Sequence, residues 1–485
     1  MTPIAATPVA WLVLLPVLLL SGTAVLVMVA DLFIEGPDRD GLGWLGIVGL
    51  IVTMVASISL WNQHEIGFNG MMAVDRYALF FNLLLCFAAG LTLLMSMSYL
   101  ELTDIRVGDY YSLVLFATVG MMLMAAATDL IVIFLGLELM SIAVYVLAGI
   151  WRRQLRSTEA ALKYFLLGAF ASGFLLFGIA LLYGATGSTQ LAVVASKIGA
   201  AGSEQRLLAS VGMGLLLIGF GFKVAAVPFH VWVPDVYEGA PTSVTAFMAV
   251  GVKAAAFAAF ARVFLHSLTK LSADWVPVLW VIAALTMTVG NVVAVRQQNI
   301  KRMLAYSSIA HAGYLLVGMI AAGEPGGSAV LFYLFAYALM NVGAFSVVIA
   351  VGKRGEPNEQ LDDYAGIGFR QPFLGFVMSV FMLSLAGIPP LVGFAGKYFI
   401  FAAAVKSGYV GLAVIGVLNS AVSMYYYVGV LVKMYMVDGT VEVVSPTSRP
   451  YLFATMLVTV AGSLFIGLFP SFTLELARQA FLSLG

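Results

Sequence analysis

The sequence predicts an all-α polytopic membrane protein with about fourteen transmembrane helices. Hydrophobic residues make up 62% of the 485 residues and charged residues only 10%, and the mean hydropathy is +1.02. A soluble chain of this length needs far more charge to cover its surface. Apolar runs of about 18 residues or more also recur from end to end, and this is the length that a helix needs to cross a bilayer.

The apolar runs are separated by short polar links, so the helices follow one another closely. With roughly 20 apolar residues per span, the expected ranges are about 9–32, 43–61, 77–100, 110–127, 129–151, 159–184, 207–236, 242–266, 276–296, 303–322, 328–351, 372–404, 410–436 and 451–470. No soluble domain fits between them. The opening MTPIAATPVA carries no basic residue, so we expect a retained first helix and no cleaved signal peptide.

The basic residues predict that both termini lie outside the cytoplasm. In this orientation thirteen Lys and Arg residues fall on the cytoplasmic side and seven on the outer side, as the positive-inside rule requires. The cytoplasmic set is Arg39, Arg106, Arg152, Arg153, Arg156, Arg296, Lys301, Arg302, Lys353, Arg354, Arg370, Lys433 and Arg449. The outer set is Arg76, Lys197, Arg206, Arg262, Lys270, Lys406 and Arg478.

The remaining basic residues are four lysines inside predicted spans, where Glu138 joins them: Lys163, Lys223, Lys253 and Lys397. A charge at a helix centre costs roughly 2.5–3.5 kcal/mol on insertion scales, so these five groups must be paired, hydrated or often neutral. Lys163 is the shallowest and could instead reach the interface. A buried lysine can lose its proton whereas an arginine cannot, so an all-lysine set favours proton carriers.

Two predicted spans are interrupted by proline beside one of these lysines. They read FGFKVAAVPFHVWVPD, with Lys223 and Pro228, and SLAGIPPLVGFAGKYF, with Pro390 and Lys397. Proline frees backbone carbonyls, and a membrane tolerates this only where the break lines a cavity or water. Paired interrupted helices in two halves of a chain suggest a transporter repeat.

Two of the four histidines are candidates for a proton relay. His230 lies in the first break and His311 lies in YSSIAHAGYLL; each could equally be a neutral, hydrogen-bonded side chain. No His, Cys and carboxylate cluster has metal-ligand spacing, and the single Cys86 has no disulfide partner. The formal net charge of zero argues against a nucleic-acid partner.

These segments and QQNIKRMLAYSSIAHAGYLL resemble the antiporter-like membrane subunits of respiratory complex I over essentially the whole chain. The superfamily also includes subunits of multisubunit cation/proton antiporters and membrane-bound hydrogenases. N-type members are the most similar, because L-type members carry a long amphipathic helix after the last spans and M-type members usually have glutamate at the position of Lys397. The resemblance implies three helices in residues 1–109, inverted five-helix repeats in 110–270 and 271–440 with broken helices seven and twelve, and a last helix and tail in 441–485.

The resemblance also implies a role for each buried charge. Glu138 and Lys223 match the family's central ion pair, and Lys163 matches the lysine that modulates it. Lys253 matches the lysine that connects the two halves, and Lys397 matches the residue on the exit side. His230 and His311 fall at positions that are polar or histidine in related subunits.

The function implied is proton translocation in a bacterial inner-membrane NADH:quinone oxidoreductase. The chain would hold no cofactor; FMN, iron–sulfur clusters and quinone would belong to partner subunits. The implied partners are the lipid bilayer, an M-type neighbour and the small K- and J-type subunits, in a hetero-oligomer. A Na⁺/H⁺ antiporter or membrane-hydrogenase subunit, and a structural spacer between pump modules, remain the alternatives. Co-purification with NADH dehydrogenase subunits would favour the first interpretation.

Overall fold

A computed structural model of the chain describes residues 10–34, 39–103, 105, 108–353, 357–441 and 446–484. Two of the basic residues used to predict the orientation, Arg106 and Arg354, lie outside the described residues. Within the described ranges, thirteen helices are long and apolar enough to cross a membrane. Twelve of the predicted spans match one of them to within about seven residues at each end, so the all-α polytopic fold is confirmed. The two predicted broken spans, the seventh and the twelfth, are indeed interrupted.

The N-terminal part contains three spans and a small hairpin. Its elements are α1 (Trp11–Asp31), α2 (Asp40–Ser59), strand β1 (Glu65–Gly67), the 3₁₀ turn η1 (Phe68–Gly70), strand β2 (Met72–Val74) and α3 (Arg76–Thr103). β1 and β2 pair antiparallel. The sequence predicts only a link at this hairpin, because strands of three residues are too short to show an alternating pattern.

The first half of the fold begins at α4 and ends at η3. Its elements are α4 (Asp109–Ala126), α5 (Leu130–Ala148), α6 (Leu155–Thr186), α7 (Leu191–Gly199), α8 (Ser203–Val224), α9 (Val233–Gly239), α10 (Thr242–Phe247), η2 (Met248–Val252), α11 (Lys253–Ala261) and η3 (Arg262–Ser267). The last four form one continuous span, in which η2 and η3 are π-helical. Helix α7 lies where the sequence predicts only a link.

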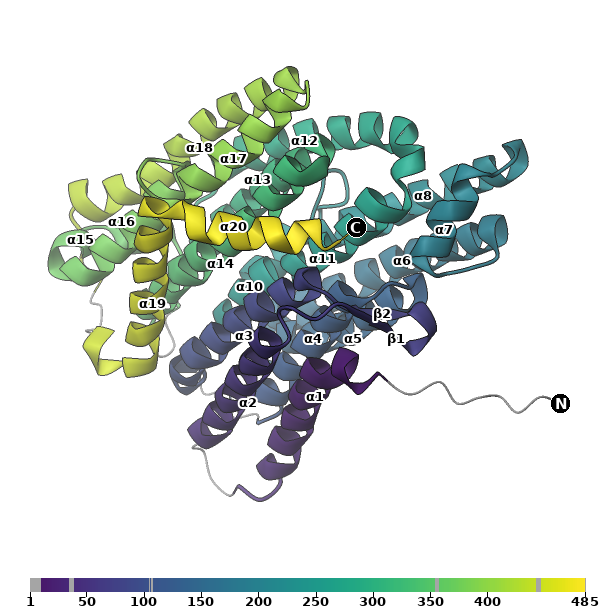
Figure 1. The fold of residues 1–485 in the computed structure, drawn as a ribbon. Helices are drawn as coiled ribbons and strands as arrows, with labels where there is room; N and C mark the ends of the chain where they lie inside the picture. The colour runs from purple at the N-terminus through teal and green to yellow at the C-terminus, as the bar shows by residue number, and fades with distance from the viewer. Residues whose placement is uncertain are drawn as a thin grey trace.

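The second half begins at the 3₁₀ turn η4 and ends at α18. Its elements are η4 (Thr269–Leu271), α12 (Ser272–Ala294), α13 (Ile300–Ala321), α14 (Gly323–Val351), the 3₁₀ turn η5 (Leu361–Tyr364), α15 (Ile367–Arg370), α16 (Pro372–Ala386), α17 (Val392–Lys406) and α18 (Val410–Met436). The two halves lie side by side in Figure 1, the first coloured from blue to teal and the second from teal-green to yellow-green. The twelfth predicted span is split into α16 and α17, as its Pro-Pro pair predicts.

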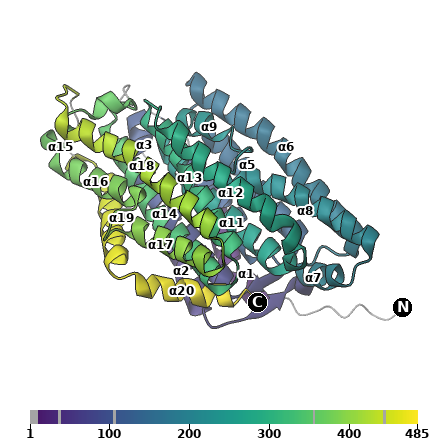
Figure 2. The same cartoon turned by 90° about the horizontal axis from the view of Figure 1, so that it is seen from above.

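The C-terminal part contains one more span and a helix that the sequence analysis missed. Its elements are the 3₁₀ turn η6 (Pro446–Ser448), α19 (Pro450–Leu468) and α20 (Pro470–Leu482). Helix α20 turns away from α19 and packs across α14 and α3, as Figures 1 and 2 show. The Oγ atom of Ser483, just after α20, accepts a hydrogen bond of 2.9 Å from the backbone N of Tyr77. The predicted tail is therefore a docked helix.

The two halves repeat the same local structure at a constant offset. Asp129 caps the N-terminus of α5 and bridges to Gln190, and Asn299 caps α13 and bridges to Gln360. Both residues of the second pair follow their counterparts by 170 positions, since 299 minus 129 and 360 minus 190 give the same number. Each cap accepts backbone N–H bonds that the first helical turn leaves free.

The helix crossings follow the same offset. A Cβ on Gly120 of α4 would lie 2.6 Å from the backbone O of Gly136 and the N of Met140 on α5. A Cβ on Gly290 of α12 would lie 3.0 Å from the O of Tyr306 and 2.6 Å from the N of Ala310 on α13. Five spans separate the start of α4 from that of α12, so the second repeat runs in the opposite direction across the membrane.

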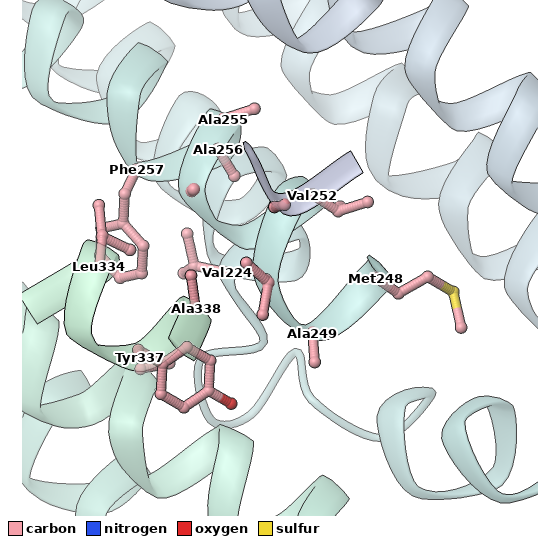
Figure 3. Packing of buried hydrophobic residues seen from close by; sticks show 14 of the residues in the cluster. Val224, Met248, Ala249, Val252, Ala255, Ala256, Phe257, Leu334, Tyr337 and Ala338 are labelled. Carbon is pink, nitrogen blue, oxygen red and sulfur yellow. The ribbon is translucent and has the colours of Figure 1, made fainter. Parts of the chain in front are cut away.

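The centre of the molecule is formed by three spans that other helices surround almost completely. Within their apolar windows, 100% of residues are buried in the span Thr242–Ser267 and 94% in α13 and α14. Figure 3 shows part of this core, where apolar side chains from η2, α11 and α14 pack together. Any charged side chain on these helices must therefore be accommodated by protein groups or internal water.

Candidate functional site

Lys223 lies at the end of α8, just before the first break. The helix ends because Ala225 adopts a left-handed conformation with φ 65°. The chain then passes through Pro228 to α9. The indole N–H of Trp232 donates to the backbone O of Phe222 at 3.1 Å, which satisfies one of the carbonyls that the break frees. The break therefore places a lysine beside a structured turn.

The ammonium group of Lys223 is held by neutral side chains. Its Nζ donates to Ser141 Oγ at 2.7 Å and to Tyr145 Oη at 3.3 Å, both on α5. The rings of Tyr145 and Tyr164 lie 5.4 and 5.8 Å from the same nitrogen, within cation–π range. The residue is only 3% exposed. Lys223 is thus buried against hydrogen-bond acceptors, and no carboxylate of the described residues forms an ion pair with it.

Glu138 lies one helical turn before Ser141 on α5. It is partly buried and accepts a hydrogen bond from the hydroxyl of Ser172 on α6. No ion pair within 4.0 Å joins Glu138 to Lys223 in the described part of the chain. The sequence predicts these two residues as direct partners. In the structure Lys223 of α8 does reach α5, but it contacts Ser141, one turn from the glutamate.

Lys253 begins α11 directly after the π-helical segment η2. Such π-helical insertions often mark functional positions. The Nζ atom donates to the backbone O of Ser308 at 2.5 Å and to the hydroxyl of the same serine. The ring of Tyr337 lies 5.5 Å away; this tyrosine and the neighbours Val252 and Ala255 are labelled in Figure 3. At 2% exposure, Lys253 is buried in the centre of the molecule.

His311 follows on α13 and joins two tyrosines. Its Nδ1 is 2.6 Å from Tyr333 Oη on α14, and its Nε2 is 3.0 Å from Tyr427 Oη on α18. The Tyr427 hydroxyl also shares a hydrogen bond of 2.5 Å with Ser307, the neighbour of Ser308. A hydrogen-bonded path therefore runs from Ser307, the chain neighbour of the serine that Lys253 contacts, through Tyr427 to the buried imidazole.

Lys397 lies on α17, just beyond the second break. Its Nζ donates to the backbone O atoms of Leu385 and Ala386, both at 2.9 Å, and to Ser420 Oγ at 2.8 Å. These are carbonyls that the end of α16 leaves free. The ring of Tyr314 lies 5.1 Å from the nitrogen. Lys397 is 4% exposed and lines a mostly apolar cavity of about 850 Å³ between α17 and α18.

Lys163 lies away from the buried lysines, in a charged cluster with 41% of its side chain exposed. It forms ion pairs of 2.7 Å with Glu159 and with Asp235 of α9. Arg302 of α13 reaches Asp235 at 2.8 Å and Glu238 at 2.9 Å. These side chains line a cavity of about 180 Å³. The cluster thus joins the end of the first break to the second half.

The pKa of Asp235 reflects this setting. Partial burial acts to raise the pKa of the carboxyl group, but hydrogen bonds from Lys163 and Arg302, and their positive charges, outweigh it and lower the pKa below its ordinary value. Asp235 is therefore an anion at neutral pH. Because it binds one cation from each half, it links α6 to α13 electrostatically.

No hydrogen bond among the described residues joins His230 to one of the buried lysines. His230 is partly buried in the first break, and its Nδ1 is buried without a hydrogen-bond partner among the described residues. Its backbone O accepts from Val233 N at 2.9 Å, so the residue helps to start α9. Its relay role stays a prediction.

Sequence reasoning missed the neutral groups that hold the lysines. Ser141 follows Glu138 by three positions and Ser308 precedes His311 by three, so each shares a helix face with a candidate residue. Only that spacing could have indicated a role for these serines. Serine itself is not diagnostic, because it is also common where helices cross. The tyrosines of α14 and α18 carried no sequence signal at all.

Two charged residues assigned to the membrane edges are buried in pairs. Arg262 binds Asp75 through two hydrogen bonds of 2.8 Å, and each side chain is 4% exposed. Lys301 binds Glu359 at 3.0 Å and the backbone O of Ala240 at 2.8 Å. Within the described ranges, no group of three or more His, Cys, Asp and Glu residues could hold a metal ion.

Comparison with known proteins assigns the chain to a family. The sequence profile described as NADH:quinone oxidoreductase/Mrp antiporter, TM, matches residues 127–423. NADH-quinone oxidoreductase subunit N of Trichlorobacter lovleyi is 49% identical over 96% of this chain and 96% of that protein. NADH-quinone oxidoreductase subunit N 2 of Roseiflexus castenholzii is 45% identical over 99% of this chain and 98% of its own length.

Solved structures agree with this assignment. A chain of respiratory complex I from Thermus thermophilus with bound aureothin is 37% identical, with a TM-score of 0.80 over 96% of this chain and 99% of that chain. A chain of the Mrp complex from Dietzia sp. DQ12-45-1b has a TM-score of 0.85 over 98% of this chain and 96% of that chain, but at 22% identity it shows a shared fold alone. The chain therefore belongs to the subunit N family of NADH-quinone oxidoreductases, the antiporter-like membrane subunits of respiratory complex I.

Proposed function

We propose that this chain, a membrane subunit of NADH-quinone oxidoreductase, translocates protons through its buried titratable side chains. The observation that carries the proposal is the set of three deeply buried lysines. Lys223, Lys253 and Lys397 each donate only to hydroxyl and carbonyl oxygens among the described residues. A buried ammonium without a bound carboxylate can release its proton at modest cost, because its neutral form loses no ion pair.

The energetic demand on such a carrier is moderate. Moving one charge across 100 mV takes about 2.3 kcal/mol, so a membrane at roughly 150–200 mV requires about 3.5–4.6 kcal/mol per proton. A carrier side chain must then alternate between proton affinities that differ by about 300- to 2,500-fold. Burial together with gain or loss of a neighbouring charge covers this range in proteins.

The proposed transfer starts in the first half. With Glu138 ionised nearby, Lys223 holds a proton; when Glu138 is neutralised or moves away, Lys223 releases it toward Lys253. No hydrogen bond among the described residues joins two lysines directly, so each step requires water or a side-chain movement. His230, in the break beside Lys223, is proposed to assist this water-mediated step.

The transfer then crosses the second half. The proton on Lys253 Nζ passes through the hydroxyl groups of the α13 turn and His311 to Lys397, which releases it on the other side. Lys163 lies outside this path. Together with its charged cluster, it is proposed to modulate the proton affinity of Glu138 and Lys223 electrostatically. These groups interact electrostatically, so the protonation of one changes the proton affinity of the others.

The driving force is proposed to come from partner subunits. Electron transfer from NADH to quinone through FMN and iron–sulfur clusters would occur there, and neighbouring M-type and small K- and J-type subunits would pass the resulting charge changes to this chain. The orientation proposed is the one that the basic residues predict, with both termini outside the cytoplasm in a bacterial inner membrane. In that orientation the Lys163 cluster faces the cytoplasm.

Replacement of Lys223 by alanine in the assembled complex tests the proposal. The number of protons pumped per electron, measured in sealed vesicles with NADH, should fall. Lys406→Ala at the exposed end of α17 is the matched control and should pump normally. Undiminished pumping by Lys223→Ala would refute the proposal and leave the structural-spacer alternative. Pumping that requires sodium would favour the antiporter alternative.

A further inference from the structure

The constant offset between the two halves identifies which residue of the second half stands where Glu138 stands in the first. The caps Asp129 and Asn299, their bridges to Gln190 and Gln360, and the α4–α5 and α12–α13 crossings all keep a separation of 170 residues. These contacts begin before the candidate residues on α5 and α13 and bracket them. The same register therefore applies along both helices.

In this register the counterpart of Glu138 is Ser308, and the counterpart of Ser141 is His311. The second half has no carboxylate at the position that carries the acidic residue of the first. Where serine replaces the glutamate, the contact with the neighbouring lysine also differs. In the first half Lys223 binds Ser141, one turn from the glutamate. Ser308 of the second half instead binds Lys253, which comes from α11 of the first half, through both its hydroxyl and its backbone O.

The groups around Lys253 and Ser308 are all uncharged or basic. The titratable groups that interact with this pair are His311 from α13, Tyr237 from α9 and Tyr337 from α14. No carboxylate of the described residues lies within ion-pair distance of Lys253 Nζ. The neighbouring helices supply apolar contacts, as Figure 3 shows for η2, α11 and α14.

We propose that Ser308 is a positioning residue for proton transfer, and that its neutrality at the glutamate-equivalent position is what allows Lys253 to release its proton. Ser308 fixes the ammonium group with two oxygen acceptors, which keeps Lys253 close to the Ser307–Tyr427–His311 path. A carboxylate in its place would hold the proton on Lys253. The inference rests on the proposed proton path and assigns this residue's part in it.

The sharpest test places aspartate and asparagine at the same position. Aspartate at 308 would form a buried ion pair with Lys253, and an opposite charge at this distance holds a lysine proton about 10- to 1,000-fold more tightly. Asparagine has nearly the same shape, keeps an oxygen acceptor and adds no charge. Comparison of Ser308→Asp with Ser308→Asn therefore separates charge from size.

The measurement is the number of protons pumped per electron in sealed vesicles, as a function of pH. For Ser308→Asp we expect a loss of more than about half of the pumping at pH 7 and recovery as the pH rises toward about 9, because a more tightly bound proton leaves only at higher pH. Ser308→Asn should lose less and show no such recovery. Ser346→Ala, which removes a buried hydroxyl that donates to Gly343 O within α14, controls for assembly.

Two outcomes separate this inference from the proton path itself. If Ser308→Asp and Ser308→Asn behave alike at every pH, charge at this position does not matter and the inference is wrong, even when Lys253→Gln abolishes pumping. If Lys253→Gln pumps normally, the path through Lys253 is wrong as well. Poor assembly of Ser308→Asp would be recognised by the amount of this subunit in the purified complex, and Ser308→Glu then provides the second charged variant.

Discussion

The buried ion pair between Arg262 and Asp75 gives a prediction with a magnitude that follows from its geometry. The guanidinium group makes two hydrogen bonds of 2.8 Å to the carboxylate, and its Nε donates to the backbone O of Ala125 at 2.6 Å. The ring of Tyr77 lies 4.8 Å from the guanidinium carbon. Both charged side chains are 4% exposed, so solvent cannot replace either partner.

Replacing Arg262 by methionine should therefore destabilise the subunit strongly. Removal of one partner from a buried pair typically costs about 3–5 kcal/mol, because the other charge remains buried and unpaired. The double variant Asp75→Asn with Arg262→Met should be less destabilised than Arg262→Met alone. Asparagine at 75 keeps an oxygen for the hydrogen bond that Asp75 Oδ1 accepts from Ala78 N at 2.7 Å, so the helix cap survives.

The assay is the temperature at which half of this subunit dissociates from the detergent-solubilised complex. The surface pair of Arg478 with Glu324, whose side chains are 50% and 39% exposed, provides the control, and Arg478→Ala should leave the dissociation temperature nearly unchanged. Equal effects of Arg262→Met and Arg478→Ala would refute the reasoning. So would a double variant that is less stable than Arg262→Met, since the cost could then not come from an unpaired Asp75.

Three further predictions concern the charged cluster, the helix crossings and the histidine. The pKa of Asp235 is lowered, so its ion pairs are fully present above about pH 4 and are lost only as the pH falls through the lower pKa of the folded state. Wild-type assembly should therefore be constant down to about pH 5. Asp235→Asn should cost about 1 kcal/mol or less, measured by thermal dissociation of the subunit. Gly120→Ala would place its Cβ 2.6 Å from backbone atoms of α5 and should cost about 1–3 kcal/mol or more, whereas Gly173→Ala, with nothing within 4 Å, should be neutral in the same assay. His311→Phe keeps a ring against Tyr333 but removes both hydrogen bonds, and should lower the pumping rate about tenfold or more; a normal rate would exclude the imidazole from the path.

The sequence predicted the spans and both breaks because a membrane restricts the backbone so strongly. Each span must satisfy its own N–H and C=O groups, so long apolar runs can only be helices, and proline inside them must mark an interruption. The same argument identified Lys223, Lys253 and Lys397 as buried. Short elements escaped prediction: β1 and β2 have three residues each, and α7 and α20 lie outside the membrane-spanning runs.

The partners of the charges could not be predicted, because they depend on how helices distant in sequence face one another. Glu138 and Lys223 were expected to pair, yet the register of α5 against α8 brings Ser141 to the lysine. Asp75 and Arg262, separated by 187 residues, form a pair that neither residue signals. The paired breaks suggested a repeat, but its 170-residue register became visible only through contacts, because α5 and α13 share no identical residue at that offset.

The central claim is that buried lysines of this chain carry protons across the membrane. The most direct test is the ratio of protons pumped to electrons transferred by a complex that contains Lys253→Met, since methionine fills the space of the lysine stem but cannot bind a proton. With this subunit fully assembled, the ratio should fall below that of the wild-type complex. An unchanged ratio in the assembled variant would contradict the account.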